Sequence, residues 1–208
     1  MLRPAALSLF VLLSSASAAT ATAFSFGCIT GSGSSTNCGI GEAQLSLDVT
    51  AAGPGQVAFQ LTNTGGEDLS AAQLYFDDDL GLLASLVSVV DGSGVDFEDG
   101  GTPADLPGGN HEDFEADYVV SAENPAPFAG VNPGESVTVV FAIAAGRTLA
   151  DVIAALESED LRVGVHGIAF EQGKSKSFIN GPVGVPEPAT LGLLLAAGLG
   201  LVLRRPGR

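Results

Sequence analysis

The segment LSLDVTAAGPGQVAFQL, residues 45–61, sets the architecture expected for the whole chain. Apolar and polar residues alternate within 45–49 and again within 57–61, the period-two pattern of half-buried β-strands. Gly53-Pro54-Gly55 lies between them and suits a tight turn. The sequence therefore predicts a β-hairpin with one buried face. The residues expected on that face are Leu45, Leu47, Val49, Val57, Phe59 and Leu61.

Further short β-segments follow along the chain, separated by turns rich in Gly, Pro, Asn and Asp. A bulge is expected at Gly167, because the apolar parity shifts there from Val163 and Val165 to Ile168 and Phe170. The last segment is expected to form an edge strand. The predicted segments are Leu74–Phe76, Leu82–Val90, Val95–Phe97, Tyr118–Val120, Val137–Ile143, Leu161–Phe170 and Phe178–Ile179.

One helix is predicted near residue 150. Its apolar residues recur at helical spacing, and Thr148 with Asp151 resembles a capping box with Asp in place of Glu. Many short strands, Gly/Pro turns and a single helix indicate a mainly β protein, an antiparallel β-sandwich of jelly-roll-like kind. The apolar positions of the helix are Leu149, Val152, Ile153 and Leu156.

The N-terminus has the three parts of an export signal. Arg3 supplies a positive start, Pro4–Leu13 is an apolar run too short to span a membrane, and small residues occupy Ser14–Ala23. Signal peptidase is expected to cleave after Ala18, which makes residues 1–18 the signal peptide, and Ala23 is a later alternative site. Residues 24–180 then form one ectodomain of ordinary single-domain size.

The exported part is strongly acidic. All 24 acidic residues of the chain lie between Glu42 and Glu187. Only four basic residues share that region, which leaves a net charge of about −20 on a surface that repels nucleic acid and anionic lipid. No nucleic-acid partner is therefore expected. The four basic residues are Arg147, Arg162, Lys174 and Lys176.

Cys28 and Cys38 are the only cysteines, ten residues apart in a Gly/Ser/Thr/Asn-rich segment. In an exported chain a close, even pair predicts a disulfide, worth about 2 to 3 kcal/mol of stability through restriction of the unfolded chain. A metal site is the alternative, but no further Cys and no nearby His completes one.

Two acidic groups are candidates for calcium. The first is Asp77-Asp78-Asp79, and the second comprises Asp91, Asp96, Glu98 and Asp99. Carboxylate oxygens are the ligands that Ca²⁺ prefers, yet neither group matches the Asp-x-Asp-x-Asp-Gly loop. Solvated surface charge is the competing interpretation, so no cofactor is assigned beyond a calcium hypothesis.

No catalytic motif stands out. His111 lies in a polar loop and His166 in a predicted strand, and their spacing fits no zinc signature. A Gly-x-Ser-x-Gly elbow, a P-loop and a dinucleotide fingerprint are all missing from the sequence. The chain has no Trp, and Tyr75 and Tyr118 are its only tyrosines, which weakens a sugar-stacking site. A non-enzymatic role is expected; a polysaccharide hydrolase with paired carboxylates stays an alternative.

The C-terminus has a fixed order of signals. After a linker, Gly181–Val185, come Pro186-Glu187-Pro188, an almost wholly apolar run Ala189–Leu203, and Arg204-Arg205. The prolines hold Glu187 on a stiff extended arm. As a helix the run reaches about 22 Å, short of the roughly 30 Å of bilayer hydrocarbon, and arginine snorkelling offsets part of the mismatch. Positive flanks stay cytoplasmic, so the Pro-Glu-Pro arm faces the other side.

This tail, residues 186–208, resembles the PEP-CTERM sorting signal of Gram-negative bacteria, whose processing partner is the membrane enzyme exosortase. The resemblance implies that Pro186, Glu187 and Pro188 are recognised, that the apolar run spans the membrane transiently, and that Arg204 and Arg205 stop transfer. The ectodomain is also similar to those of that family in its cysteine pair and in segments 75–78, 106–110, 131–135 and 161–166. An ordinary C-terminal anchor is the alternative for the tail.

By this resemblance the chain is expected to be an exported, non-enzymatic protein of the cell surface or extracellular matrix, associated with exopolysaccharide or biofilm. Signal peptidase and exosortase are its expected processing enzymes. The alternatives are a secreted polysaccharide-acting hydrolase and a calcium- or ligand-binding module, each using the same tail for sorting.

Overall fold

The computed structural model describes residues 21–30, 36–171 and 173–181. Within them the protein is mainly β and antiparallel, as predicted, with ten strands in one sheet. None of the helices in this part of the chain has the length and hydrophobicity needed to cross a membrane. The elements are β1 Thr22–Cys28, α1 Thr36–Gln44, β2 Leu45–Gly53, β3 Gln56–Asn63, β4 Ser70–Asp78, β5 Leu83–Asp91, β6 Phe97–Asp99, η1 Gly109–His111, β7 Tyr118–Ala122, α2 Ala126–Ala129, β8 Ser136–Ile143, α3 Leu149–Ser158, β9 Leu161–Ile168 and β10 Lys176–Gly181.

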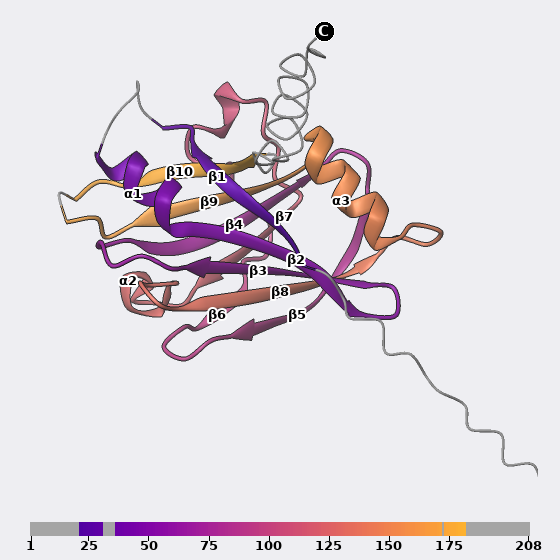
Figure 1. Cartoon of the computed structure of the whole chain (residues 1–208), viewed down its shortest axis with the longest axis horizontal. Helices are drawn as coiled ribbons and strands as arrows, with labels where there is room; N and C mark the ends of the chain where they lie inside the picture. The colour runs from indigo at the N-terminus through magenta and orange to yellow at the C-terminus, as the bar shows by residue number, and fades with distance from the viewer. Residues whose placement is uncertain (1–20, 31–35, 172, 182–208) are drawn as a thin grey trace, which may run out of the picture.

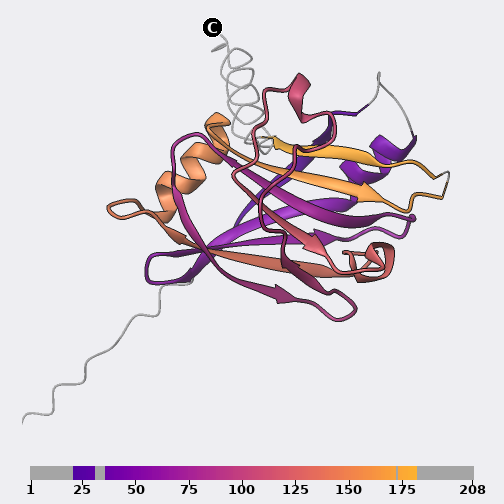
Figure 2. The same ribbon diagram turned by 180° about the vertical axis from the view of Figure 1, so that it is seen from behind.

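The sheet is single and curls back on itself. Its strand order is β5-β8-β3-β2-β1-β10-β9-β4-β7-β6, and the two end strands, β5 and β6, contact each other. Figures 1 and 2 show the two halves of the sheet facing one another. Phe59 of β3 and Phe76 of β4 lie in opposite halves, yet their ring centroids are 5.2 Å apart. The core is thus packed between halves of one continuous sheet.

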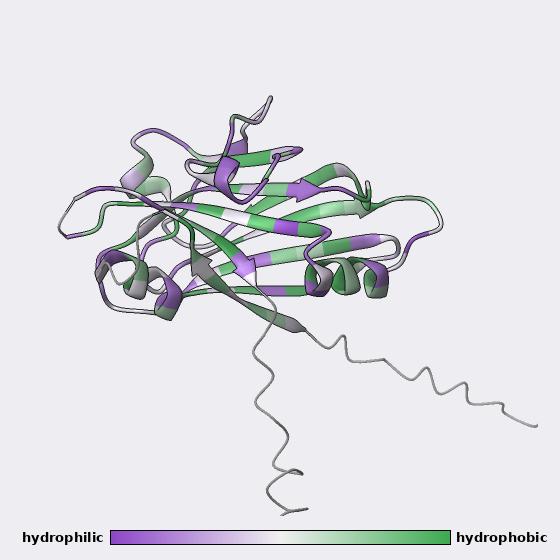
Figure 3. Ribbon diagram, turned by 90° about the horizontal axis from the view of Figure 1, so that it is seen from above, coloured by the Kyte–Doolittle hydropathy of each residue, from purple (hydrophilic) through white to green (hydrophobic). Residues whose placement is uncertain are grey.

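The hairpin of residues 45–61 is confirmed. β2 and β3 pair in register from Leu45 opposite Asn63 to Ala51 opposite Val57, and the alternating apolar residues point into the core. Gly55 adopts a positive φ of 67° in the turn, which glycine tolerates without steric cost. Figure 3 shows hydrophobic colour along much of the strands, while hydrophilic colour is frequent in the loops between them.

Two finer predictions are wrong. The segment around Phe178 is not an edge strand, because β10 lies mid-sheet between β1 and β9. The register irregularity in the β4–β9 pairing adjoins Gly167, but the extra residue is Ala72 of β4, between the pairs Ala71–Gly167 and Gln73–His166, and not a residue of β9. β9 ends at Ile168, and the positive φ of 59° at Ala169 turns the chain before Phe170. The parity shift in the sequence therefore marks a strand end.

Two elements near the N-terminus were not predicted. β1 has buried Phe24 and Phe26 two residues apart, a strand signal hidden beside the small residues of the export segment. α1 contains poor helix formers, so propensity gives no sign of it. Gly41 is needed there, because a Cβ atom would lie 2.1 Å from Cζ of the buried Phe178. Packing against the sheet therefore fixes this helix.

The predicted helix is confirmed as α3, which packs against β9, β10 and β2. The expected capping box is present: the Asp151 backbone N–H donates to the Thr148 hydroxyl, and the Thr148 backbone N–H donates to the Asp151 carboxylate. In Figure 1 α3 lies at one end of the sheet, and α1 and α2 lie at the other. These helices cover the ends of the curled sheet.

The covering loop, residues 100–117, packs on the outer face of the sheet. Its Leu106 and Phe114 form a second apolar cluster with Tyr75 and Val119, separate from the main core. Gly164 of β9 permits this approach, because a Cβ atom there would lie 2.7 Å from Cδ2 of Leu106. The loop thus forms a second layer over β9, β4 and β7, and it leads directly into β7.

Candidate ligand-binding cleft

A cleft of about 590 Å³ lies at the seam where the two ends of the curled sheet approach each other. One wall is the start of β5, and the other is formed by β7 with the beginning of the covering loop. We call this the seam cleft. Its lining residues are Ala84, Ser85, Leu86, Asp99, Gly101, Thr102, Pro103, Asp117, Tyr118, Val119, Val120 and Phe141.

The lining combines polar groups with an apolar floor. The carboxylates of Asp99 and Asp117 and the hydroxyls of Ser85 and Thr102 can accept or donate hydrogen bonds. Aliphatic side chains and the ring of Phe141 supply apolar surface. None of the described residues that line the cleft is cationic, so the cleft suits a neutral, hydroxyl-rich ligand or a cationic one better than an anion.

Tyr118 is held rigidly in the seam cleft. Its hydroxyl donates to the Leu83 carbonyl oxygen at 2.9 Å, and its ring packs edge-on against Phe141 with centroids 5.0 Å apart. Burial raises the pKa of the Tyr118 hydroxyl, and the nearby carboxylates of Asp78 and Asp117 raise it further. The phenol therefore stays protonated at physiological pH and bridges the two walls.

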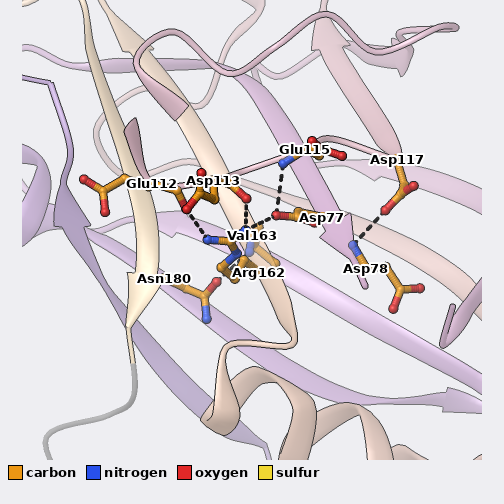
Figure 4. Close-up of polar contacts among 9 residues, drawn as sticks. All are labelled: Asp77, Asp78, Glu112, Asp113, Glu115, Asp117, Arg162, Val163 and Asn180. Atoms are coloured by element: carbon orange, nitrogen blue, oxygen red, sulfur yellow. Dashed lines mark hydrogen bonds and ion pairs between the residues drawn. The ribbon is translucent and has the colours of Figure 1, made fainter. Parts of the chain in front are cut away.

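Asp78 and Asp117 fix the relative position of the same walls. The Asp78 backbone N–H donates to Oδ2 of Asp117 at 2.8 Å, as Figure 4 shows. Oδ2 of Asp78 accepts from the Leu83 backbone N–H at 2.6 Å, just at the start of β5. Asp78 of β4 therefore positions both the Asp117 carboxylate of the seam cleft and the start of β5 on the opposite wall.

Asp77 and Arg162 anchor the covering loop. The two side chains form an ion pair of 2.5 Å, and Arg162 also donates to the carbonyl oxygens of Glu112 and Asp113 (Figure 4). Asp77 accepts a further hydrogen bond from the Glu115 backbone N–H at 3.2 Å. Burial raises the pKa of the Asp77 carboxyl, and Arg162 opposes that rise. These contacts hold the loop that carries Asp117.

In the first calcium candidate, Asp77-Asp78-Asp79, the first two carboxylates form contacts within the protein. Asp77 and Asp78 are consecutive strand residues, so their side chains leave opposite faces of the sheet, and Asp79 is exposed in the turn that follows. Asp77 pairs with Arg162, and Asp78 accepts from Leu83. Across residues 21–30, 36–171 and 173–181, no group of three or more His, Cys, Asp or Glu residues is placed to hold a metal ion.

The second acidic group makes local contacts of its own. Asp91 accepts from the Phe97 backbone N–H at 3.0 Å, and Asp99 accepts from that of Gly101 at 2.9 Å. A hydrogen bond with the Glu123 carboxyl raises the pKa of Glu98, with additional repulsion from neighbouring acids. These contacts shape the β5–β6 turn and the rim of the seam cleft, where Asp99 alone joins the lining.

The cysteine pair forms the predicted disulfide. Cys28, at the end of β1, and Cys38, in α1, are bonded with their Cα atoms 5.4 Å apart. The bridge ties the first strand to the first helix. Lys176 of β10 donates to the Thr30 carbonyl oxygen at 2.7 Å, which holds the segment after Cys28 against the sheet.

The two histidines lie apart. His111 belongs to the short helix η1 in the covering loop and is exposed, whereas His166 is partly buried on the outer face of β9. Burial lowers the pKa of His166. His166 lines a smaller pocket of about 290 Å³ with Gln73, Ser121 and Asn124. No sequence motif links these residues; the pairing of β9, β4 and β7 brings His166, Gln73 and Ser121 together.

The sorting residues Pro186, Glu187, Pro188, Arg204 and Arg205 lie outside the described residues, as do the signal peptide 1–18 and the apolar run 189–203.

Comparison with protein-family models, curated proteins and solved structures found no match for the chain. The seam cleft was missed in the sequence because its walls come from segments more than thirty residues apart, around Ser85 and around Asp117.

Proposed function

We propose that the protein is an exported, non-enzymatic component of the cell surface or extracellular matrix, sorted by an exosortase through its C-terminal tail. The observation that carries the proposal is the order Pro186-Glu187-Pro188, apolar run 189–203, Arg204-Arg205 in a chain whose N-terminal residues have the pattern expected of an export signal. The tail anchors the chain in the inner membrane until processing releases it to the surface or matrix.

The described domain supports this arrangement. Its sheet runs from Thr22 to Gly181, between the two end segments, and its disulfide suits an oxidising compartment. Thr22 and Ala23 pair with Val49 and Asp48 of β2. Cleavage after Ala23 would remove both pairs, so we place signal-peptidase cleavage after Ala18.

For the fold, we propose a jelly-roll-like β-sandwich whose two layers are joined through β1 and β10. The seam cleft at its open side is the surface best suited to exopolysaccharide, because Asp99, Asp117 and Thr102 can hydrogen-bond sugar hydroxyls over an apolar floor. Sandwich folds serve both structural and enzymatic roles, so this assignment rests on the cleft and the tail and not on the fold.

The sorting proposal predicts that Glu187→Gln slows processing of the tail. The substitution removes the charge of the Pro-Glu-Pro arm but keeps its size and its two prolines. In cells of the native host, fractionation and mass spectrometry should show unprocessed protein ending in Arg208 accumulating in the inner membrane. Deletion of residues 186–208 should abolish membrane retention altogether.

Glu171→Gln is the matched control, since it makes the same chemical change at an exposed position of the ectodomain. It should leave the distribution unchanged. Wild-type protein that retains Arg208 and stays in the inner membrane would contradict the proposal and favour a permanent anchor.

The cleft assignment predicts that Asp99→Asn weakens binding to the host's own purified exopolysaccharide by roughly tenfold, the effect expected for loss of a charged hydrogen-bond partner. Sedimentation with the polysaccharide and calorimetry measure the change. Asp105→Asn, an exposed residue of the covering loop outside the cleft lining, should bind like wild type. Shortening of the polysaccharide during the incubation would instead favour the hydrolase alternative.

A further inference from the structure

A row of polar side chains crosses the outer face of the sheet. Ser177 of β10 pairs in register with His166 of β9, His166 with Gln73 of β4, and Gln73 with Ser121 of β7. Directly opposed residues of an antiparallel pair point to the same face. Four neighbouring strands therefore place hydroxyl, imidazole, amide and hydroxyl side by side.

Hydrogen bonds connect the middle of this row. Nε2 of Gln73 donates to the Ser121 hydroxyl oxygen at 3.2 Å, and Oε1 of Gln73 accepts from the Tyr75 hydroxyl at 2.9 Å. Nδ1 of His166 lies 3.3 Å from the same Oε1. With the Gln73 amide in this orientation its oxygen is an acceptor, which assigns the His166 proton to Nδ1 and leaves a lone pair on Nε2.

Among the described residues, the hydrogen-bonded series from His166 through Gln73 to Ser121 keeps a free acceptor at one end and a free donor at the other. Nε2 of His166 has no hydrogen-bond partner within the described residues. The Ser121 hydroxyl already accepts from Gln73, so its own proton remains available for donation. Both residues line the pocket of about 290 Å³, together with Asn124 and with Ala72, Ala126 and Ile168.

We propose that this outer-face pocket, distinct from the seam cleft, binds a single neutral sugar unit through adjacent hydroxyl groups. One ligand hydroxyl donates to Nε2 of His166, and another accepts from Ser121, which complements the free acceptor and the free donor that the polar row supplies. Asn124 can serve either group, and the apolar residues face the C–H surface of the sugar.

The charge around the pocket agrees with a neutral ligand. Among the residues that the structure describes, no carboxylate, lysine or arginine lines it. The charged side chains on the surrounding strands have other contacts: Arg162 pairs with Asp77, Lys176 donates to Thr30, and Glu98 interacts with Glu123. A metal ion is a poor fit, because a lone imidazole with amide and hydroxyl oxygens offers few strong ligands.

The first test reads the tautomer of His166 without any ligand. Long-range ¹H–¹⁵N spectra of the full chain in mild detergent at neutral pH should show a protonated Nδ1 and an unprotonated Nε2 for His166. The signal is assigned by its loss in His166→Phe. A proton on Nε2 would overturn the proposal, because the pocket would then hold no free acceptor.

The second test adds the methyl glycosides of glucose, galactose and mannose as probes. At least one should shift the His166 imidazole ¹⁵N signals saturably, and the shift should vanish in Ser121→Ala. His111→Phe, a change at the exposed histidine of η1, should leave the response intact. Absence of a saturable shift with all three glycosides, or an equal response in Ser121→Ala, would overturn the proposal.

Binding should also fall at acidic pH, because protonation of Nε2 removes the acceptor. Burial lowers the pKa of His166, so the loss is expected below its ordinary value of 6.5. Affinity that is unchanged down to pH 4 would count against the His166 contact. These outcomes are independent of the tail and of Asp99, so they separate this proposal from the sorting and seam-cleft assignments.

Discussion

Phe76→Ala is expected to lower the free energy of unfolding by about 3 to 5 kcal/mol, the range for truncating a buried aromatic side chain. Phe76 is fully buried, and its ring lies 5.2 Å from that of Phe59 and 4.8 Å from that of Phe141. These three rings join β3 and β8 to β4 across the core. Truncation therefore opens a cavity between the two halves of the curled sheet.

Thermal unfolding followed by circular dichroism should show a fall in Tm of roughly 6 to 20 °C for a domain of this size. Phe128→Ala is the matched control, since the same atoms are removed from a side chain that is 78% exposed. It should change stability by less than about 0.5 kcal/mol. Equal losses at the two positions would show that the halves are not joined through Phe76.

Local sequence patterns predicted most of the strands and the long helix, because each depends on neighbours in the chain. The hairpin of β2 and β3 needs only alternation and a turn, and α3 needs only an apolar stripe and a cap at Thr148. Strand order depends instead on pairing across the whole chain. β1 at the start pairs with β10 at the end, a contact that no local pattern encodes.

The same limit applies to the candidate sites. Asp77-Asp78-Asp79 stands out in the sequence as an acidic group, but β4 sends the side chains of Asp77 and Asp78 to opposite faces, where they have different partners. His166, Gln73 and Ser121 show no motif at all, and they meet only because three strands pair in one register. Spacing along the chain could not distinguish a structural carboxylate from a binding residue.

Arg162→Met is expected to cost about 3 to 5 kcal/mol at neutral pH, because it leaves the Asp77 carboxylate buried without its counterion. The exposed fractions of the two side chains are 15% for Arg162 and 2% for Asp77. The carbonyl oxygens of Glu112 and Asp113 also lose their donor. The covering loop should loosen, and hydrogen exchange should rise across residues 106–117. Arg147→Met, at an exposed position, is the matched control.

The pH dependence of this loss tests its cause. Burial already raises the folded-state pKa of Asp77 above its ordinary value of 3.8, and removal of Arg162 raises it further. Between 3.8 and that raised pKa the folded state binds a proton that the unfolded state has released, so stability falls as pH rises through this window. The deficit of Arg162→Met should therefore be smallest below pH 3.8 and should grow toward neutral pH.

Adding Asp77→Asn to Arg162→Met should recover part of the lost stability and flatten its pH dependence, because a neutral amide needs no counterion. A deficit that is constant with pH would mean that Arg162 acts through its hydrogen bonds to Glu112 and Asp113 and its contact with the Phe114 ring, 5.3 Å away, and not through its ion pair with Asp77.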